Sequence, residues 1–116
     1  MSELQGALLG YKEKINNNDK MRVLLKNWEP CVSIVAVDTG DQFNIQFKDT
    51  FIDTVVEGEG GVAKHQVTLE ATYVELEGIF TGVINPANSF LDGNLVIYAD
   101  DKDQIKLDAI SLVLWG

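Results

Sequence analysis

The chain has 116 residues, of which 46% are hydrophobic and 23% are charged, close to the averages of soluble globular domains. A chain of this length builds one hydrophobic core, so we expect residues 1–116 to form a single domain. There are 18 acidic and 9 basic residues, which give a net charge of −9. This charge excludes nucleic acid as a partner, because the phosphate backbone would be repelled.

The charge is distributed unevenly along the chain. Residues 1–30 hold five basic and four acidic side chains, whereas residues 31–116 hold four and fourteen. The N-terminal basic side chains either form a solvated helix face or make weak peripheral contact with an anionic membrane. They are Lys12, Lys14, Lys20, Arg22 and Lys26.

The only cysteine, Cys31, excludes a disulfide framework and a thiolate metal cluster. No apolar run approaches the length that spans a membrane, and residues 1–15 do not read as a secretory signal. We therefore expect a cytoplasmic protein without a metal or cofactor.

Helical periodicity dominates the first 30 residues. Apolar residues recur at three- and four-residue steps across 4–15 and predict an amphipathic helix that ends at 16–18. Asp19 is a candidate N-cap for a second helix that carries Trp28 and ends before Pro30.

The period then changes to two, which is typical of strands. Residues 31–37 are apolar on both faces and predict a central strand, and 42–47 and 51–56 complete an antiparallel meander. The glycine-rich residues 57–61 predict a hairpin tip, and a fourth strand follows at 63–70, with Val67 and Leu69 facing inward.

A helix follows, capped by Thr72 and stopped by Gly82 and Pro86, after which 87–91 form one short helical turn. The apolar stripe of the capped helix consists of Tyr73, Leu76, Ile79, Phe80 and Val83.

A fifth strand is expected at 94–99, and Asp100 or Asp101 caps a last helix. The apolar residues of this helix cover more than one face, so it is either buried all round or meets a ligand, a partner chain or a membrane. They are Ile105, Leu107, Ala109, Ile110, Leu112, Val113 and Leu114.

This order of elements resembles the sterol carrier protein 2 family (SCP-2-like domains) over essentially the whole chain. The most specific pieces are residues 67–69 leading to Leu76, the break at 82–86, and the segment Ala-Asn-Ser-Phe-Leu-Asp-Gly-Asn-Leu-Val-Ile at 87–97. Asn94 replaces the lysine that is common after the glycine in the family, and the acidic total contrasts with basic animal carriers.

The resemblance implies an α+β fold, in which a five-stranded, mostly antiparallel sheet has helices packed on one face and a hydrophobic tunnel between. It also implies non-enzymatic intracellular binding or transfer of a lipid: a fatty acid or acyl-CoA, a sterol or an isoprenoid-like molecule.

The candidate ligand-binding residues mapped onto this tunnel are Leu76, Ile79, Phe80, Val83, Phe90, Leu91, Ile105, Ala109, Leu112 and Val113. The alternative for each is plain core packing, because an apolar helix stripe is most often core. Polar candidates for the tunnel mouth are Gln46, Tyr73 and Asn88.

The sequence offers no catalytic group. His65 has no histidine partner and is expected to be exposed, and Cys31 has no basic neighbour in sequence and is expected to be a structural thiol. The acidic run at 100–103 lacks the glycine and glutamate of a calcium loop and fits helix capping. Residues 58–61 do not fit a phosphate cradle, because no helix follows them.

An alternative function from another class is a protein-interaction module or homodimer that uses the apolar C-terminal helix as its interface. A small hydrolase or isomerase is disfavoured, because no nucleophile, base and orienting group can be assembled from these residues.

Overall fold

The computed structural model describes residues 3–58 and 67–115. Its elements in chain order are α1 (Glu3–Asn16), α2 (Lys20–Leu24), β1 (Cys31–Ala36), β2 (Gln42–Lys48), β3 (Phe51–Glu57), β4 (Val67–Ala71), α3 (Tyr73–Phe80), α4 (Pro86–Leu91), β5 (Val96–Tyr98) and α5 (Asp101–Trp115). Within these described residues, no helix combines the length and apolar character needed to cross a bilayer.

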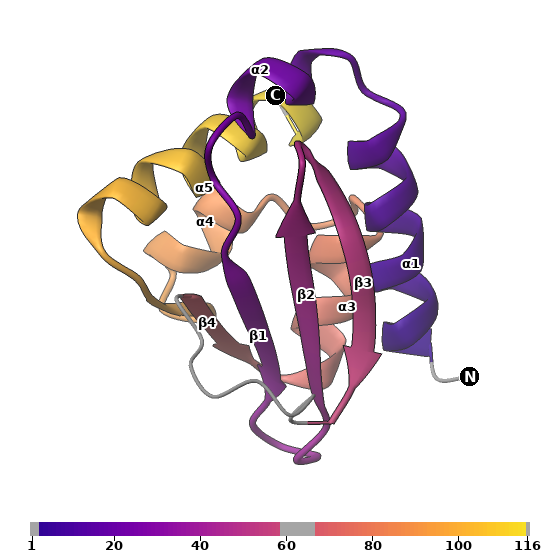
Figure 1. Cartoon of the computed structure of the whole chain (residues 1–116). Coiled ribbons are helices and arrows are strands. Elements are labelled where there is room, and N and C mark those ends of the chain that lie inside the picture. The colour runs from indigo at the N-terminus through magenta and orange to yellow at the C-terminus, as the bar shows by residue number, and fades with distance from the viewer. Residues whose placement is uncertain (1–2, 59–66, 116) are drawn as a thin grey trace.

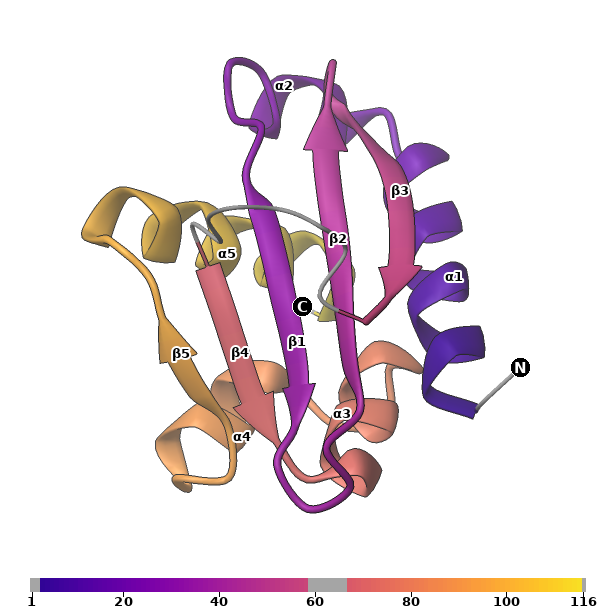
Figure 2. The ribbon, with the colours of Figure 1, turned by 60° about the horizontal axis from the view of Figure 1, so that its bottom comes forward.

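The five strands form one mixed sheet in the order β3-β2-β1-β4-β5, which can be followed across Figure 2. The β1–β2, β2–β3 and β4–β5 pairs are antiparallel, and β1 and β4 are parallel. The predicted α+β fold, its antiparallel meander and its mostly antiparallel sheet are confirmed. The strand β1 lies at the centre of this sheet, as predicted.

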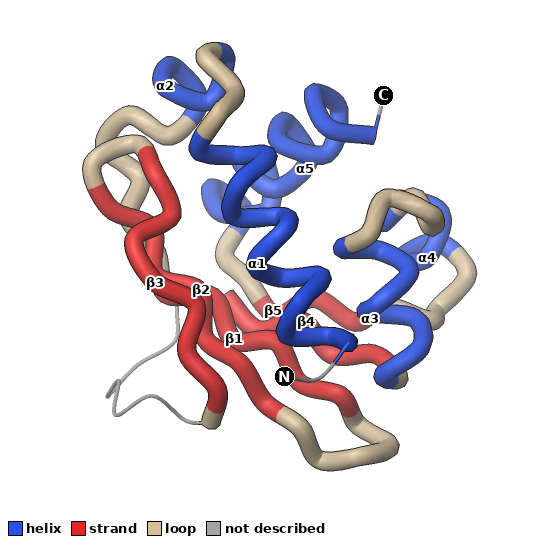
Figure 3. Tube along the Cα trace, turned by 90° about the vertical axis from the view of Figure 1, so that its right-hand side faces the viewer, coloured by secondary structure: helices blue, strands red, loops and turns tan. Residues whose placement is uncertain are grey.

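The helices α1, α3, α4 and α5 lie on one face of the sheet (Figures 1 and 3). The side chains that alternate toward this face are buried, among them Ile34 on β1, Phe43 and Ile45 on β2, and Val67 on β4. The period-two pattern therefore builds the core between one sheet face and the helices, as predicted.

Some predicted features fall outside the described residues. These are most of the glycine-rich tip, at 59–61, the start of the predicted fourth strand, at 63–66, and His65. The described part of β4, with Val67 and Leu69 buried, agrees with the predicted inward face.

The second helix is shorter than predicted. It ends at Leu24, and Trp28 lies outside it after Asn27, whose φ is +60°. The side chain of Asp19 forms no capping hydrogen bond; instead, Asn18 Oδ1 accepts from Lys20 N at 3.0 Å. Asp19 therefore occupies the predicted N-cap position, but the Asn18 side chain supplies the hydrogen bond at this turn.

Both predicted ends of α3 are confirmed: Thr72 caps its start and Gly82 terminates it. Thr72 Oγ1 accepts from Glu75 N at 3.3 Å at the start, and Gly82 has a φ of +88° at the end. Gly82 N donates to Ile79 O and Val83 N donates to Gly78 O, the pair of bonds that defines a Schellman cap. Val83 consequently leaves the helical stripe and is 82% exposed.

The last strand is shorter than the predicted 94–99. The amides of Asn94 and Leu95 both donate to Ser89 O, so these two residues belong to the turn after α4. The predicted start of the last helix is confirmed: α5 begins at Asp101, and Asp100 O accepts from Gln104 N at 2.9 Å.

The β2–β3 hairpin contains a strained residue whose replacement is expected to stabilise the protein. Lys48 pairs with Phe51, which leaves Asp49 and Thr50 as a two-residue turn with φ values of 52° and 69°. Glycine suits the second position of such a turn, and a β-branched residue does not. We expect Thr50→Gly to raise the free energy of unfolding in urea by about 1 kcal/mol.

The control for this prediction is Thr54→Gly, which makes the same change on exposed β3 outside the turn. It is expected to lower the free energy of unfolding, because glycine weakens a strand interior. A lower value for Thr50→Gly as well would contradict the assignment of strain to the turn.

Candidate functional site

The first half of α5 is attached to the segment around α2 by two hydrogen bonds. Trp28 Nε1 donates to Asp103 Oδ1 at 2.7 Å, and both side chains are buried. Lys106 Nζ, one turn further along α5, donates to Leu24 O at 2.7 Å. The Trp28 ring also packs on Phe47 of β2, with ring centroids 5.2 Å apart. These contacts fix the start of α5 relative to the sheet.

The other end of α5 is held by aromatic rings. Trp115 stacks on Tyr11 of α1, with centroids 5.9 Å apart and an interplanar angle of 25°. Tyr11 also makes an edge contact with Phe80 of α3 at 5.0 Å. Between the two attachments, Ile110 is the one apolar side chain of α5 that is fully buried. The helix is therefore held at both ends, and between them Leu107, Val113 and Leu114 also pack half-buried against the core.

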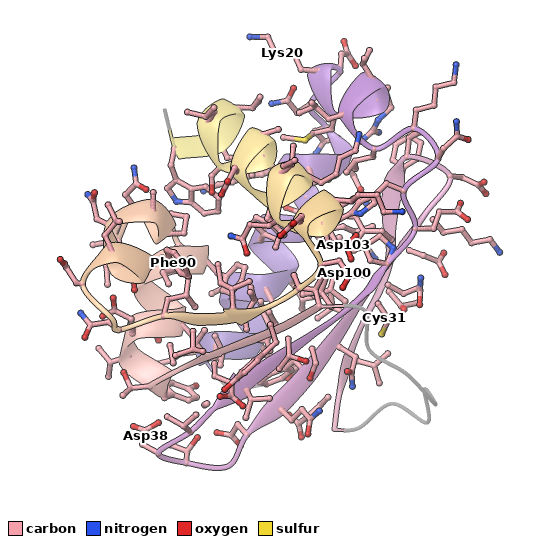
Figure 4. The ribbon with its side chains drawn as sticks, turned by 90° about the vertical axis from the view of Figure 1, so that its left-hand side faces the viewer. Lys20, Cys31, Asp38, Phe90, Asp100 and Asp103 are labelled. Atoms are coloured by element: carbon pink, nitrogen blue, oxygen red, sulfur yellow. The ribbon has the colours of Figure 1, made fainter. Side chains whose placement is uncertain are left out.

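A cavity of about 700 Å³ lies in this region, bounded by α3, α4, α5 and the β4–β5 edge of the sheet. Its volume falls within the range of roughly 300–1,000 Å³ that small-molecule sites occupy. Figure 4 shows Phe90 on α4 and Asp103 at the start of α5, on two of these elements. The lining consists of Tyr11, Leu69, Leu76, Ile79, Phe80, Asn85, Pro86, Ala87, Phe90, Leu91, Leu95, Ile97, Gln104, Leu107, Asp108, Ile110, Ser111, Leu112 and Trp115.

Six of the ten candidate ligand-binding residues line this cavity: Leu76, Ile79, Phe80, Phe90, Leu91 and Leu112. The other four, Val83, Ile105, Ala109 and Val113, do not. Val83 follows the Schellman cap and points to solvent. The three on α5 recur at intervals of four residues and share a stripe beside the one that faces the cavity. Since α5 is apolar on several faces, periodicity alone did not select the correct stripe.

None of the three predicted mouth residues, Gln46, Tyr73 and Asn88, lines the cavity. Gln46 Nε2 donates to backbone carbonyls, including Phe47 O at 2.9 Å, and Tyr73 Oη accepts from Leu4 N at 2.9 Å. Asn88 is exposed and does not line the cavity. The polar lining comes instead from Tyr11, Asn85, Gln104, Asp108 and Ser111.

The sheet side of the lining and the polar residues of α5 were not among the predicted site residues. Leu69 was predicted to face inward, and Ile97 lies opposite it in the β4–β5 ladder, so alternation along the strands was a usable signal for both. Gln104, Asp108 and Ser111 recur at steps of four and three residues, a second usable signal for one helix face.

The lining is poor in groups that could perform acid–base or nucleophilic chemistry. The described lining residues include no histidine, cysteine or lysine. Burial raises the pKa of Tyr11 above its ordinary value, which makes its phenol harder to ionise. Cys31 is buried on β1, away from Phe90 in Figure 4, and burial raises its thiol pKa. This agrees with the structural thiol predicted from sequence.

No protein-family model and no curated protein matches the sequence. Solved structures do match. A crystal structure of sterol carrier protein 2 is 14% identical, aligns over 96% of this chain and 95% of its own, and has a TM-score of 0.67. A palmitated sterol carrier protein 2-like protein from Aedes aegypti is 15% identical, aligns over 88% and 91% of the two chains, and has a TM-score of 0.55.

A double mutant of a sec-alkyl sulfatase also matches, with 17% identity and a TM-score of 0.60 over 80% of this chain. This chain spans only 14% of the sulfatase's length. Together, the matches to carriers of nearly equal length show that the chain has the SCP-2-like fold, as the sequence analysis expected.

The attachment of α5 through Trp28 yields a stability prediction. Trp28→Phe removes the donor and leaves the buried Asp103 carboxylate unpaired, so we expect the free energy of unfolding in urea to fall by about 2 kcal/mol. Trp115→Phe is the matched control, because its indole N–H forms no hydrogen bond within the described structure while its ring stacking can be retained. Equal losses in the two variants would show that the hydrogen bond contributes nothing specific.

Proposed function

We propose that this chain binds one apolar, lipid-like molecule in the cavity and carries it without catalysing a reaction. The observation that carries the proposal is a cavity of about 700 Å³ in a protein of 116 residues. Most of its lining side chains are apolar, and its polar groups come mainly from α5 and the residue before α4. This is the arrangement expected of a small-molecule site.

Burial of hydrocarbon supplies enough free energy for such binding. Each methylene removed from water contributes about 0.8 kcal/mol, so ten contribute about 8 kcal/mol before the costs of association. No specific charged contact is needed for this term, because it depends on apolar area alone. Fatty acids or acyl-CoA, sterols and isoprenoid-like molecules all remain within the proposed class of cargo.

The matching structures support the same class of ligand. Their names describe a sterol carrier and a palmitated protein, each matching over most of its length. The sulfatase match involves a small part of a larger enzyme. With no histidine, cysteine or lysine among the described lining residues, these likenesses favour a carrier over an enzyme.

The surroundings of the cavity suggest how a ligand enters. Leu91 and Leu112 line it and are 80% and 71% exposed, so apolar surface continues from the cavity to the outside of the protein. The basic residues predicted for membrane contact lie on or next to α1 and α2. Arg22 is already engaged, because its guanidinium donates to Ile15 O and Asn16 O and lies over the Phe51 ring. We therefore assign any weak membrane contact to the four lysines. We also propose that the protein resides in a reducing compartment such as the cytoplasm, which fits its single cysteine.

Exposed apolar side chains on α5 favour a second candidate function, a homodimer or protein-interaction module. Ile105 is 67% exposed and does not line the cavity. If α5 forms an interface, the mass in solution will rise with protein concentration, and Ile105→Lys will abolish the rise.

A cavity-filling substitution tests the proposed function. Ser111 is half-buried in the lining, and Ser111→Trp places an indole in the cavity. We expect the Kd for the uncharged dye Nile red, measured by fluorescence titration, to rise by about tenfold or more, a loss of at least about 1.4 kcal/mol.

The matched control is Ile105→Trp on the same helix, which adds an indole outside the lining and should leave the Kd within about twofold. Circular dichroism verifies that both variants fold. Equal dye affinity in the two folded variants would contradict binding in this cavity.

A further inference from the structure

The cavity lining carries one negative charge and, among the described residues, no positive charge. Asp108 is the only acidic residue in the lining, and no lysine or arginine lines it. Lys106 lies two residues earlier on α5, but its Nζ donates to Leu24 O at 2.7 Å, on the α2 side of the helix. The charge that a ligand meets in this cavity is therefore that of Asp108.

The other polar side chains with which α5 lines the cavity, Gln104 and Ser111, are neutral and can form hydrogen bonds with a ligand. Gln104, Asp108 and Ser111 are spaced by four and three residues along α5, which places them on one side of the helix. None of the three side chains forms a hydrogen bond within the described structure. Gln104 and Ser111 can both donate and accept, whereas the Asp108 carboxylate only accepts. A ligand head that donates hydrogen bonds has partners here.

The geometry indicates which end of a ligand meets this stripe. Asp108 is exposed while Gln104 and Ser111 are half-buried, so the stripe runs along the side of the cavity that water reaches. The apolar residues of α3 and β4, such as Leu76 and Leu69, are buried on the sheet side. A tail lying against the sheet would leave the ligand's polar end at the α5 stripe.

From these observations, and resting on the proposed function, we infer that the cavity selects lipids whose polar end donates hydrogen bonds and carries no negative charge, such as long-chain alcohols or amines, over fatty acid anions. A carboxylate head would lie near Asp108 without a cation to neutralise it. The net charge of −9 lowers the affinity for anions further. This narrows the proposed cargo to neutral or cationic lipids.

The test is displacement of Nile red by three ligands with the same tail: dodecanol, dodecylamine and dodecanoate at pH 8, below their aggregation concentrations. We expect dodecanol and dodecylamine to bind about twofold to fivefold more tightly than dodecanoate, the size of an exposed like-charge contact. Asp108→Asn should reduce this preference, and Asp108→Lys should reverse it in favour of dodecanoate.

Asp53→Asn is the matched control, because it removes the same charge from exposed β3, outside the lining. It should leave the preference unchanged. Equal affinity for the three ligands, or an equal effect of Asp53→Asn and Asp108→Asn, would overturn the inference while leaving cavity binding intact. Failure of all three ligands to displace the dye would overturn the proposed function itself, and the preference with it.

Discussion

The buried hydrogen bond from Trp28 to Asp103 gives α5 a directional attachment that hydrophobic packing does not supply. Among the apolar side chains of α5, Ile110 is fully buried, and Leu107, Val113, Leu114 and Trp115 pack half-buried against the core. A carboxylate held away from water requires its donor, which makes this contact directional. With the stacking of Trp115 on Tyr11 at the other end, α5 spans the cavity instead of closing onto the sheet.

The parts of the fold that local chemistry determines were predictable from the sequence. Alternation identified the strands, and Thr72 and Gly82 marked both ends of α3 because capping is a local property. The extent of α2 was not predictable from periodicity, because the residues after Leu24 continue the apolar pattern after the helix has ended. The Trp28–Asp103 contact joins residues 75 positions apart, and nothing local indicates such a pair.

The candidate site was predictable only in part for a related reason. The α3 stripe and Phe90 could be placed because their elements have one apolar side. The apolar residues of α5 that face the cavity could not be identified, because that helix is apolar on several faces. Its rotation depends on the distant contacts of Asp103 and Trp115.

Lipid binding is tested by native mass spectrometry of the protein purified without detergent from its own cells, before and after solvent extraction. We expect one ligand per chain, lost on extraction, with an apolar body and a head that carries no negative charge. An empty monomer, or an empty dimer, would contradict a lipid-binding role for the cavity beneath α5.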